Sequence, residues 1–434
     1  MCKPLKKGLM LSLLLSITFA VGAQTVEHES GTETPLSELI RSAKTGATII
    51  LSQPYYTGPV IIDKPLRLIG RLKNGKKPIV DGQGTGTTIT VDARNVVIEN
   101  IEVINSGKDI GREESGIAIT EKADNAHITM VTVRNCGFGI WLRKTKSPVI
   151  SKNIVIGQPE VKMMEDLGNS IHLFDVRDAL IEDNQIRQGR DGIYISNSQG
   201  SILRNNTINR TRFGIHYMYS HSNQVSDNRV DSSSVGLALM YSKTLDIFGN
   251  SVSNSVNHGI LLRTLFYSEI YNNTVTTSFD GIAFSGCSFD TLRNNLVQDN
   301  KEGIIVSDSR KNLVYENTFI NNKIQLNFQD NVTIPWGHAM RGNYWNDYVG
   351  RDANQDGLGD MPHYPAGILS FLVTRYPTLK VIMKSPAMML LQSLESKFPA
   401  IRPAGVIEPY PLIKPATSTA LLNENKSYNT EEIH

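Results

Sequence analysis

The hydrophobic and polar positions of this chain repeat with a period of about 22 residues. Each repeat is marked by an asparagine, found at Asn184, Asn206, Asn228, Asn250, Asn273, Asn295 and Asn317. Eight or nine residues after each of the first six comes a glycine, at Gly192, Gly214, Gly236, Gly259, Gly281 and Gly303. A short run rich in isoleucine and leucine follows each glycine, as a strand requires. Six consecutive units keep this register with one single-residue slip, so the repeat decides the architecture.

A unit of this length fits one coil of a parallel β-helix. A single coil cannot bury its apolar face alone, so coils must stack, with neighbouring strands about 4.8 Å apart. The recurring asparagine would then form a buried ladder of side-chain amides, and the glycine would occupy a corner where backbones approach closely. We therefore predict an all-β fold, a right-handed parallel β-helix with coils of about 22 residues.

The regions outside the repeat differ from it in composition. We expect five parts in order: a signal peptide (1–23), an N-terminal cap (24–57), the β-helix (58–346), a C-terminal extension (347–417) and a disordered tail (418–434). The basic, apolar start ends in the small residues Val21-Gly22-Ala23, which a signal peptidase accepts. Thr34 and Pro35 predict the N-cap and first position of a short helix that caps the β-helix. A wider spacing predicts an inserted loop over 157–169.

Charge and cysteine content exclude some classes of function. The chain has 44 Lys and Arg against 42 Asp and Glu, and three of the lysines lie in the predicted signal peptide. A nearly neutral mature chain does not predict nucleic acid as a partner, because phosphate binding needs a clustered basic excess. Two cysteines remain beyond the signal peptide, Cys136 and Cys287, at different positions of the repeat. We expect two free thiols, buried as small apolar side chains or used for metal.

Alternation along each strand predicts which side chains face outward. Counted from the glycine, positions one and three are apolar and point inward, so positions two and four point outward. Position two carries Trp141, His172, Tyr194, His216, Ala238, Leu261, Ala283 and Ile305. Position four carries Arg143, Phe174, Ser196, Met218, Met240, Arg263, Ser285 and Ser307. Neither column contains Asp or Glu, whereas glycan-cleaving enzymes use paired carboxylates, so we predict that the protein is not an enzyme.

Soft metal ligands gather in these two columns. Met218 and Met240 occupy the same position of adjacent coils, and His216 precedes Met218 by two residues. His172 lies two coils away in the column of His216. Thioethers and imidazoles together suit Cu(I), which predicts a copper site at these four residues. The alternative is that methionine and aromatic side chains only cover an apolar outer face.

A short acidic segment follows the repeat. Asp352, Asn354, Asp356 and Asp360 place oxygen ligands at alternate positions, as in the first half of a calcium-binding loop. His363 stands where such loops carry a bidentate glutamate. The segment therefore predicts either a calcium site or a simple turn of Asp, Asn and Gly.

A second helix is predicted from Ser385-Pro386 onward. Its apolar side chains recur at helical spacing on one face, at Met388, Leu391, Leu394 and Phe398. This face either packs on the end of the β-helix or binds a partner protein.

Several motifs in order resemble one known family. They are Gly214-Ile-His-Tyr-Met-Tyr-Ser220, Leu237-Ala-Leu-Met-Tyr-Ser242, Gly342-Asn-Tyr-Trp-Asn-Asp-Tyr348 with the following Asp352–Asp360 loop, Lys384-Ser-Pro-Ala, Phe398-Pro and Pro411-Leu. Over most of the mature chain the sequence resembles the NosD family, β-helix proteins of nitrous oxide reductase copper-site assembly. It departs from the family pattern around Met361-Pro-His363 and in its C-terminal tail.

The resemblance implies a periplasmic accessory protein attached to the permease and ATPase of an ABC transporter. It implies copper delivery to apo nitrous oxide reductase, and a copper chaperone is a further candidate partner. The family pattern carries His216, Met218 and Met240, which favours a metal or partner role for this face. Two alternatives stay open, a secreted polysaccharide lyase or C5-epimerase and a docking scaffold that does not bind copper.

Overall fold

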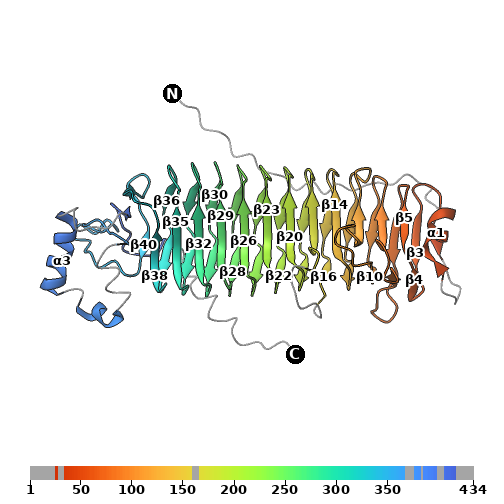
Figure 1. Ribbon diagram of the computed structural model, residues 1–434, viewed down its shortest axis with the longest axis horizontal. Helices are drawn as coiled ribbons and strands as arrows, with labels where there is room; N and C mark the ends of the chain where they lie inside the picture. Colours follow the sequence, from red (N-terminus) through yellow and green to blue (C-terminus); the bar gives the residue numbers. More distant parts are fainter. Residues whose placement is uncertain are drawn as a thin grey trace, which may run out of the picture.

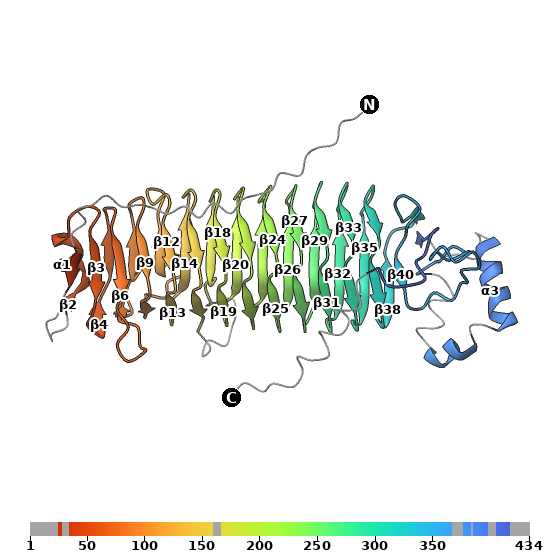
Figure 2. The same cartoon turned by 180° about the vertical axis from the view of Figure 1, so that it is seen from behind.

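Parallel strands stack coil upon coil along a rod, and short helices lie at both of its ends (Figure 1, Figure 2). The computed structural model describes residues 25–27, 34–158, 166–366, 376–382, 385–397 and 405–416. The predicted all-β parallel β-helix is confirmed. The predicted signal peptide and disordered tail lie outside the described residues.

Three sheets run the length of the rod. Sheet A has 13 strands: β1 (Thr25–Glu27), β3 (Thr48–Leu51), β6 (Arg67–Gly70), β9 (Val97–Glu99), β12 (His127–Thr129), β15 (Val149–Ser151), β18 (Leu180–Glu182), β21 (Ile202–Arg204), β24 (Gln224–Ser226), β27 (Asp246–Phe248), β30 (Glu269–Tyr271), β33 (Thr291–Arg293) and β36 (Leu313–Tyr315). Sheet B has 14: β2 (Thr34–Pro35), β4 (Tyr55–Thr57), β7 (Ile79–Asp81), β10 (Glu102–Ile104), β13 (Thr132–Arg134), β16 (Ile154–Ile156), β19 (Gln185–Arg187), β22 (Thr207–Asn209), β25 (Arg229–Asp231), β28 (Ser251–Ser253), β31 (Thr274–Thr276), β34 (Leu296–Gln298), β37 (Thr318–Ile320) and β40 (Tyr344–Trp345). Sheet C has 12: β5 (Val60–Ile62), β8 (Ile89–Val91), β11 (Ser115–Ile119), β14 (Phe138–Arg143), β17 (Ile171–Phe174), β20 (Asp191–Ser196), β23 (Phe213–Met218), β26 (Val235–Met240), β29 (His258–Arg263), β32 (Asp280–Ser285), β35 (Glu302–Ser307) and β38 (Ile324–Phe328).

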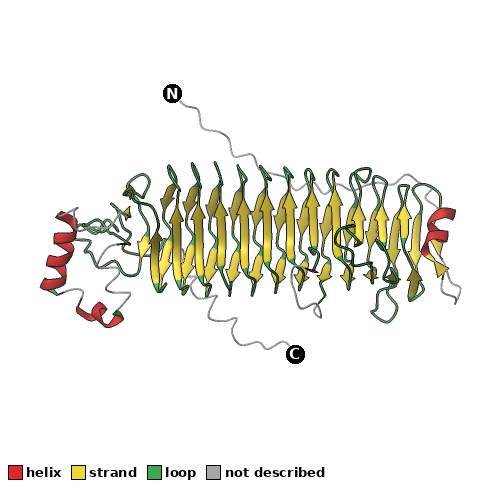
Figure 3. Ribbon diagram, viewed as in Figure 1, coloured by secondary structure: helices red, strands yellow, loops and turns green. Residues whose placement is uncertain are grey.

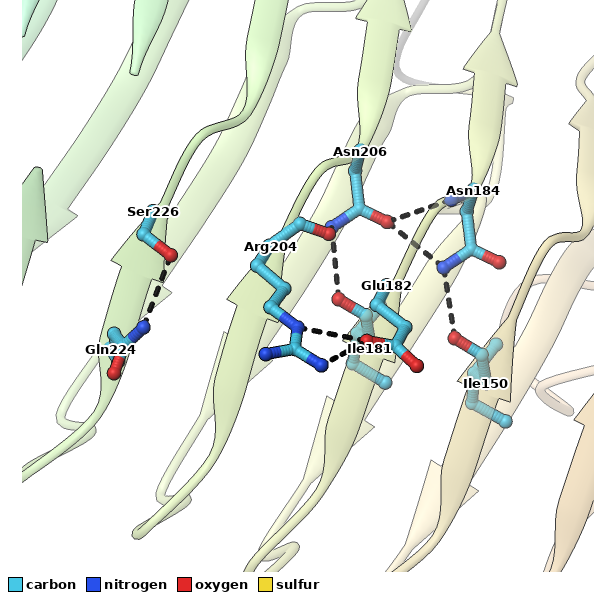
Figure 4. Close-up of polar contacts among 8 residues, drawn as sticks. All are labelled: Ile150, Ile181, Glu182, Asn184, Arg204, Asn206, Gln224 and Ser226. Atoms are coloured by element: carbon cyan, nitrogen blue, oxygen red, sulfur yellow. Dashed lines mark hydrogen bonds and ion pairs between the residues drawn. The ribbon is translucent and has the colours of Figure 1, made fainter. Parts of the chain in front are cut away.

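The recurring asparagine forms the predicted ladder inside the rod. The side-chain amide of Asn184 donates to Oδ1 of Asn206 at 2.9 Å and to the carbonyl of Ile150 at 2.9 Å (Figure 4). Asn206 repeats the pattern, donating to Asn228 Oδ1 at 2.9 Å and to the Ile181 carbonyl at 3.0 Å. Each amide thus joins three consecutive coils, which satisfies polar groups that an apolar core cannot.

The recurring glycine is required by close packing of backbones. A Cβ at Gly236 would lie 2.2 Å from Cγ1 of Val252 and 2.5 Å from the carbonyl oxygen of Gly259. Gly236 lies within strand β26 rather than at a corner, and no larger residue fits this position without moving the next coil.

Both cysteines that the structure describes, Cys136 and Cys287, are buried free thiols, as predicted. Burial raises the pKa of the Cys287 thiol to about 12, so this side chain is a neutral thiol rather than a thiolate.

The N-terminal end differs from the prediction in detail. Thr34 is not the N-cap and Pro35 is not the first helical residue, because both residues form β2 and pair with Tyr56–Thr57 of sheet B. Helix α1 (Leu36–Ser42) begins one residue later, with Pro35 as N-cap at ψ 120° and without a side-chain cap hydrogen bond. Leu36, Leu39 and Ile40 of α1 are buried against the first coils, so the helix closes this end of the core. Coil strands β3 and β4 already lie before residue 58.

At the other end, the repeat gives way to shorter elements. These are β39 (Ile334–Pro335), which pairs with β41 (Val406–Ile407), the 3₁₀ helix η2 (Pro377–Ile382) and helix α3 (Pro386–Lys397). None of the helices in the described segments has the length and apolar character needed to cross a membrane.

A buried glutamate closes the asparagine ladder. Asn343, the last rung, donates its side-chain amide to Glu408 Oε2 at 2.7 Å, and the indole N–H of Trp345 donates to the same oxygen at 3.2 Å. Burial raises the pKa of Glu408 from 4.5 to about 7, although these two hydrogen bonds lower it in part. The C-terminal extension therefore returns to the end of the β-helix through a carboxyl group that is easily protonated.

This carboxyl group predicts a stability that falls with pH. Because the folded-state pKa is raised, the stabilising proton is fully present below about pH 4.5 and is lost as the pH rises through about 7. The difference corresponds to roughly 3 kcal/mol of unfolding free energy at high pH. We expect the melting temperature to fall between about pH 5 and pH 7 and to level off above pH 8, and Glu408→Gln to flatten this slope. Equal slopes in the two proteins, measured by calorimetry, would show that Glu408 is ionised in the fold.

Candidate metal-binding face

The outer surface of sheet C places the predicted soft ligands as the repeat implied. Met218 pairs with Met240 on the adjacent strand, and His216 lies two residues before Met218 on β23. The intervening residue, Tyr217, is fully buried in the core, so His216 and Met218 share the outward side. We call His216, Met218 and Met240 the metal-binding face, after the copper site predicted there, which stays a prediction.

An aromatic column runs across this face and separates the two predicted histidines. The rings of Trp141, His172, Tyr194 and His216 follow one another, with centroid distances of 3.8, 4.6 and 4.9 Å. Tyr194 therefore lies between His172 and His216, and the structure does not bring the two imidazoles together. Burial lowers the pKa of His172 to about 3, so its ring is neutral.

His216 is held by a carboxylate that the sequence reasoning missed. Its Nδ1 lies 2.8 Å from Oδ2 of Asp191, and Arg212 binds both oxygens of Asp191 at 2.8 Å. Burial alone would raise the pKa of Asp191, but the hydrogen bonds from His216 and Arg212 keep it below its ordinary value. A carboxylate only accepts, so the Nδ1 of His216 is the donor.

A third outward column explains why Asp191 was missed. Strand pairing joins Asp191 to Phe213 and then Ile193 to Ile215, skipping the glycine between them. The residue before each glycine therefore also faces outward, and further along the column Asp280 and Glu302 occupy it. The prediction that this face lacks carboxylates was wrong, because it assumed strict alternation from the glycine.

Each of these carboxylates contacts a neighbouring side chain. Asp280 Oδ2 lies 2.7 Å from Nδ1 of His258, and Glu302 accepts a hydrogen bond from Asn327 at 2.7 Å. Asp191 is engaged by His216 and Arg212. Each of these three carboxylates is thus paired with a polar or cationic side chain next to it.

The second nitrogen of His216 is the group that this arrangement leaves available. Nε2 is buried and has no hydrogen-bond partner among the described residues. A buried polar atom without a partner is costly and calls for an explanation. A histidine whose Nδ1–H is held by a carboxylate presents its Nε2 lone pair in the manner of a metal ligand.

Methionine sulfur has to supply the rest of any site here. The described residues contain no cluster of three or more His, Cys, Asp and Glu side chains that could hold an ion. Met240 is half-buried and packs, with Phe213, against the outward apolar residues Val235, Ala238 and Leu261. Met218 is half-buried as well. The candidate donors are therefore one imidazole and two thioethers on the same apolar face, a set that suits a soft, singly charged ion.

Comparison with known proteins decides the family. A family model described as periplasmic copper-binding protein (NosD) matches residues 155–350. A protein of Pseudomonas aeruginosa, named probable ABC transporter binding protein NosD, is 34% identical over 424 residues, covering 94% of this chain and 96% of the relative. This chain belongs to the NosD family.

A second relative agrees with membership of the NosD family, and a solved structure agrees with the fold. A protein of the same name from Stutzerimonas stutzeri is 34% identical over 387 residues, covering 86% of this chain and 88% of that protein. Among solved structures, the Dettilon tailspike protein aligns with a TM-score of 0.53 at 15% identity, covering 70% of this chain and 68% of that one. The similarity to the tailspike protein shows the β-helix fold alone.

The acidic loop of this NosD family member is organised by its own backbone. Asp352 accepts the N–H groups of Asp356 at 3.1 Å and Gly357 at 3.0 Å. Asp360 accepts the N–H of Ala353 at 2.9 Å, and Asn354 donates to Asp356 at 2.8 Å. These contacts describe a polar turn, and calcium binding by Asp352, Asn354, Asp356 and Asp360 stays a prediction.

Helix α3 uses its predicted apolar stripe partly within the protein. Met388 and Leu391 are half-buried and cluster with Val349, whereas Leu394 is 38% exposed. Leu390, which the sequence reasoning did not select, is 61% exposed. Phe398, the fourth predicted partner-binding residue, lies outside the described residues. The helix thus packs on the extension and leaves Leu390 and Leu394 on its surface.

Proposed function

We propose that this NosD family member is a periplasmic accessory protein of nitrous oxide reductase maturation that binds Cu(I) and passes it to the apo-reductase. The family is described as periplasmic and copper-binding, which supports both the compartment and the cargo. The observation that carries the proposal is the buried, unpartnered Nε2 of His216 on the outward side that it shares with the paired Met218 and Met240.

The geometry suits capture and release of a soft ion. Paired residues on adjacent strands lie about 4.8 Å apart, so the two sulfurs of Met218 and Met240 can converge on one ion. His216 can add its Nε2 from the same strand, oriented by Asp191. Two neutral thioethers and one imidazole bind Cu(I) selectively yet leave room for a ligand from a receiving protein.

The hydrogen bond behind His216 predicts a measurable effect on affinity. Asp191→Asn removes the charge that fixes the Nδ1–H of His216, and removing such support typically costs about 10–100-fold in metal affinity. We expect a loss of this size when Cu(I) is titrated in competition with a chromophoric chelator. Asp280→Asn, which alters the other His–Asp pair of the column, is the matched control and should keep the parental affinity. Equal affinities for all three proteins would remove Asp191 from the site.

We also propose that the protein associates with the permease and ATPase of an ABC transporter. Both relatives are named ABC transporter binding proteins, which supports this partner. The exposed Leu390 and Leu394 on α3 are the surface we assign to the contact, since exposed leucines on a terminal helix fit helix-in-groove recognition. A truncation before Ser385 would not test this, because it also removes Glu408 from the ladder end.

Two surface substitutions test the contact without that complication. Leu390→Gln together with Leu394→Gln should leave the melting temperature within a few degrees of the parent, because neither side chain is buried. We expect the variant to lose co-purification with the transporter. Leu313→Gln, an exposed leucine on sheet A, is the control and should co-purify normally. Undiminished recovery of the transporter with the α3 variant would move the contact elsewhere.

A further inference from the structure

Exposed aromatic side chains gather in the turns that lead from sheet C to sheet A, drawn as green loops along the rod in Figure 3. Tyr219 stacks on Tyr241 with ring centroids 5.2 Å apart, and Tyr267 stacks on Phe289 at 5.1 Å. Their exposed fractions are 52%, 37%, 62% and 45%, and Phe266 adds another 37%. We call these five residues the aromatic ridge. The two stacks lie in the turns of four successive coils, and exposed aromatic side chains gathered in this way mark interaction sites.

The ridge stands on backbone positions that disfavour bulky residues. Tyr219, Tyr241, Tyr267 and Phe289 have φ values of 52°, 51°, 56° and 62°, in the left-handed region. Asparagine, aspartate and glycine adopt this region most easily, and the neighbouring coil carries Asn197 in register with Tyr219. Many other non-glycine corner residues of the repeat, such as Ser222 and Thr244, share this conformation, so what distinguishes the ridge is a large apolar ring left exposed at each of these positions.

The ridge adjoins the metal-binding face. Tyr219 directly follows Met218, and Tyr241 directly follows Met240. The backbone N–H of Tyr219 donates to the carbonyl of Met240 at 3.4 Å, so the turn continues the register of the two methionines. A protein that takes an ion from Met218 and Met240 has to approach within ligand distance of them, and so contacts these turns.

Charge along the ridge defines the complementary surface. Lys243, Arg263, Arg310 and Lys311 are exposed in or beside these turns, and the exposed acidic residues of the same stretch include Glu269 and Asp308. Lys311 Nζ lies 5.2 Å from the ring of Phe289. A surface with aromatic side chains at its centre and mostly cations at its border fits an apolar patch with an acidic rim.

We propose that the aromatic ridge is the docking surface for the protein that receives Cu(I) from the metal-binding face. This inference rests on the function proposed above, because it assumes that the face carries an ion to be handed over. The receiving protein is a folded protein with an apolar, acid-rimmed patch next to its own copper ligands. The ridge would hold it in one orientation so that ligands from both proteins share the ion in transit.

A substitution taken from the chain itself tests the ridge. In the double variant Tyr219→Asn and Tyr241→Asn, both positions receive the residue that the preceding coil carries as Asn197, which relieves the left-handed strain. The variant should melt no lower than the parent and bind Cu(I) with unchanged affinity. Transfer of Cu(I) to purified apo nitrous oxide reductase should slow by about tenfold or more, since exposed tyrosines at an interface centre dominate binding.

The control alters an aromatic stack away from the ridge. Phe248→Leu with Tyr271→Leu removes the stacked pair on sheet A and should transfer copper at the parental rate. The unsubstituted protein tests the proposed function. If it neither binds nor transfers Cu(I), both the proposed function and this inference are overturned. The ridge variant decides the inference. If the ridge variant transfers Cu(I) as fast as the parent, the inference is overturned. It is also overturned if the parent self-associates and the ridge variant does not, because the ridge would then bind a second copy of the chain.

Discussion

Replacing Met218 and Met240 by leucine is expected to abolish specific Cu(I) binding while leaving the β-helix folded. The two side chains pair on adjacent strands of sheet C, on the same outward side as His216, whose buried Nε2 has no hydrogen-bond partner among the described residues. Leucine keeps the volume and apolar character of methionine, so each change should cost under about 1.5 kcal/mol of stability. The loss of affinity should exceed the roughly 10–100-fold expected from altering a residue behind a ligand.

A matched control separates thioether number from thioether position. Met130 and Met340 are exposed by 39% and 63% and lie away from the metal-binding face. Met130→Leu with Met340→Leu removes the same number of sulfur atoms and should bind Cu(I) like the parent. The measurement is competitive titration under reducing conditions, followed by activity of the reductase matured with each protein. If the Met218 and Met240 variant binds Cu(I) as tightly as the parent, these two methionines contribute only to packing.

The second large effect concerns the asparagine ladder. Asn228 accepts two hydrogen bonds from Asn206 and donates to Leu203 and Asn250. Asn228→Ala would leave several of these buried groups without partners, each at a cost of about 1–3 kcal/mol. We expect a total loss of roughly 3 kcal/mol or more and a clear fall in melting temperature.

Hydrogen exchange locates this effect. The amides of the coils around Asn206 and Asn250 should exchange faster in the Asn228→Ala protein, while coils at the ends of the rod change less, because each coil contacts only its neighbours. Asn209→Ala, a half-buried asparagine on β22 outside the ladder, is the control and should change stability by under about 1 kcal/mol. A ladder variant as stable as this control would mean that water replaces the missing amide.

Much of the fold could be predicted because the repeat is a one-dimensional pattern. One register decides every coil, so the positions of Asn184 through Asn317 predicted the buried ladder directly. The same register predicted that Met218 pairs with Met240. Residue counting sufficed here because stacked coils convert a fixed sequence spacing into contact.

The remaining site features depend on local departures from that pattern. Asp191 faces His216 because the pairing skips the glycine, which simple alternation does not anticipate. Tyr194 separates His172 from His216. The positions of the three rings show this separation, whereas the sequence register shows only that the three residues share a column. Glu408 reaches Asn343 from 65 residues away outside the repeat, so no spacing signalled the contact. These features follow from side-chain packing and chain return, which a sequence pattern does not encode.

The coordination of the bound ion tests the central claim most directly. Copper K-edge X-ray absorption should be measured on the mature protein loaded with one equivalent of Cu(I) under reducing conditions. We predict a shell of two thioether sulfurs and one imidazole nitrogen, with the sulfur contribution absent from the Met218→Leu and Met240→Leu double variant. A parental shell of nitrogen and oxygen alone, or a sulfur shell that survives in the double variant, would contradict the account.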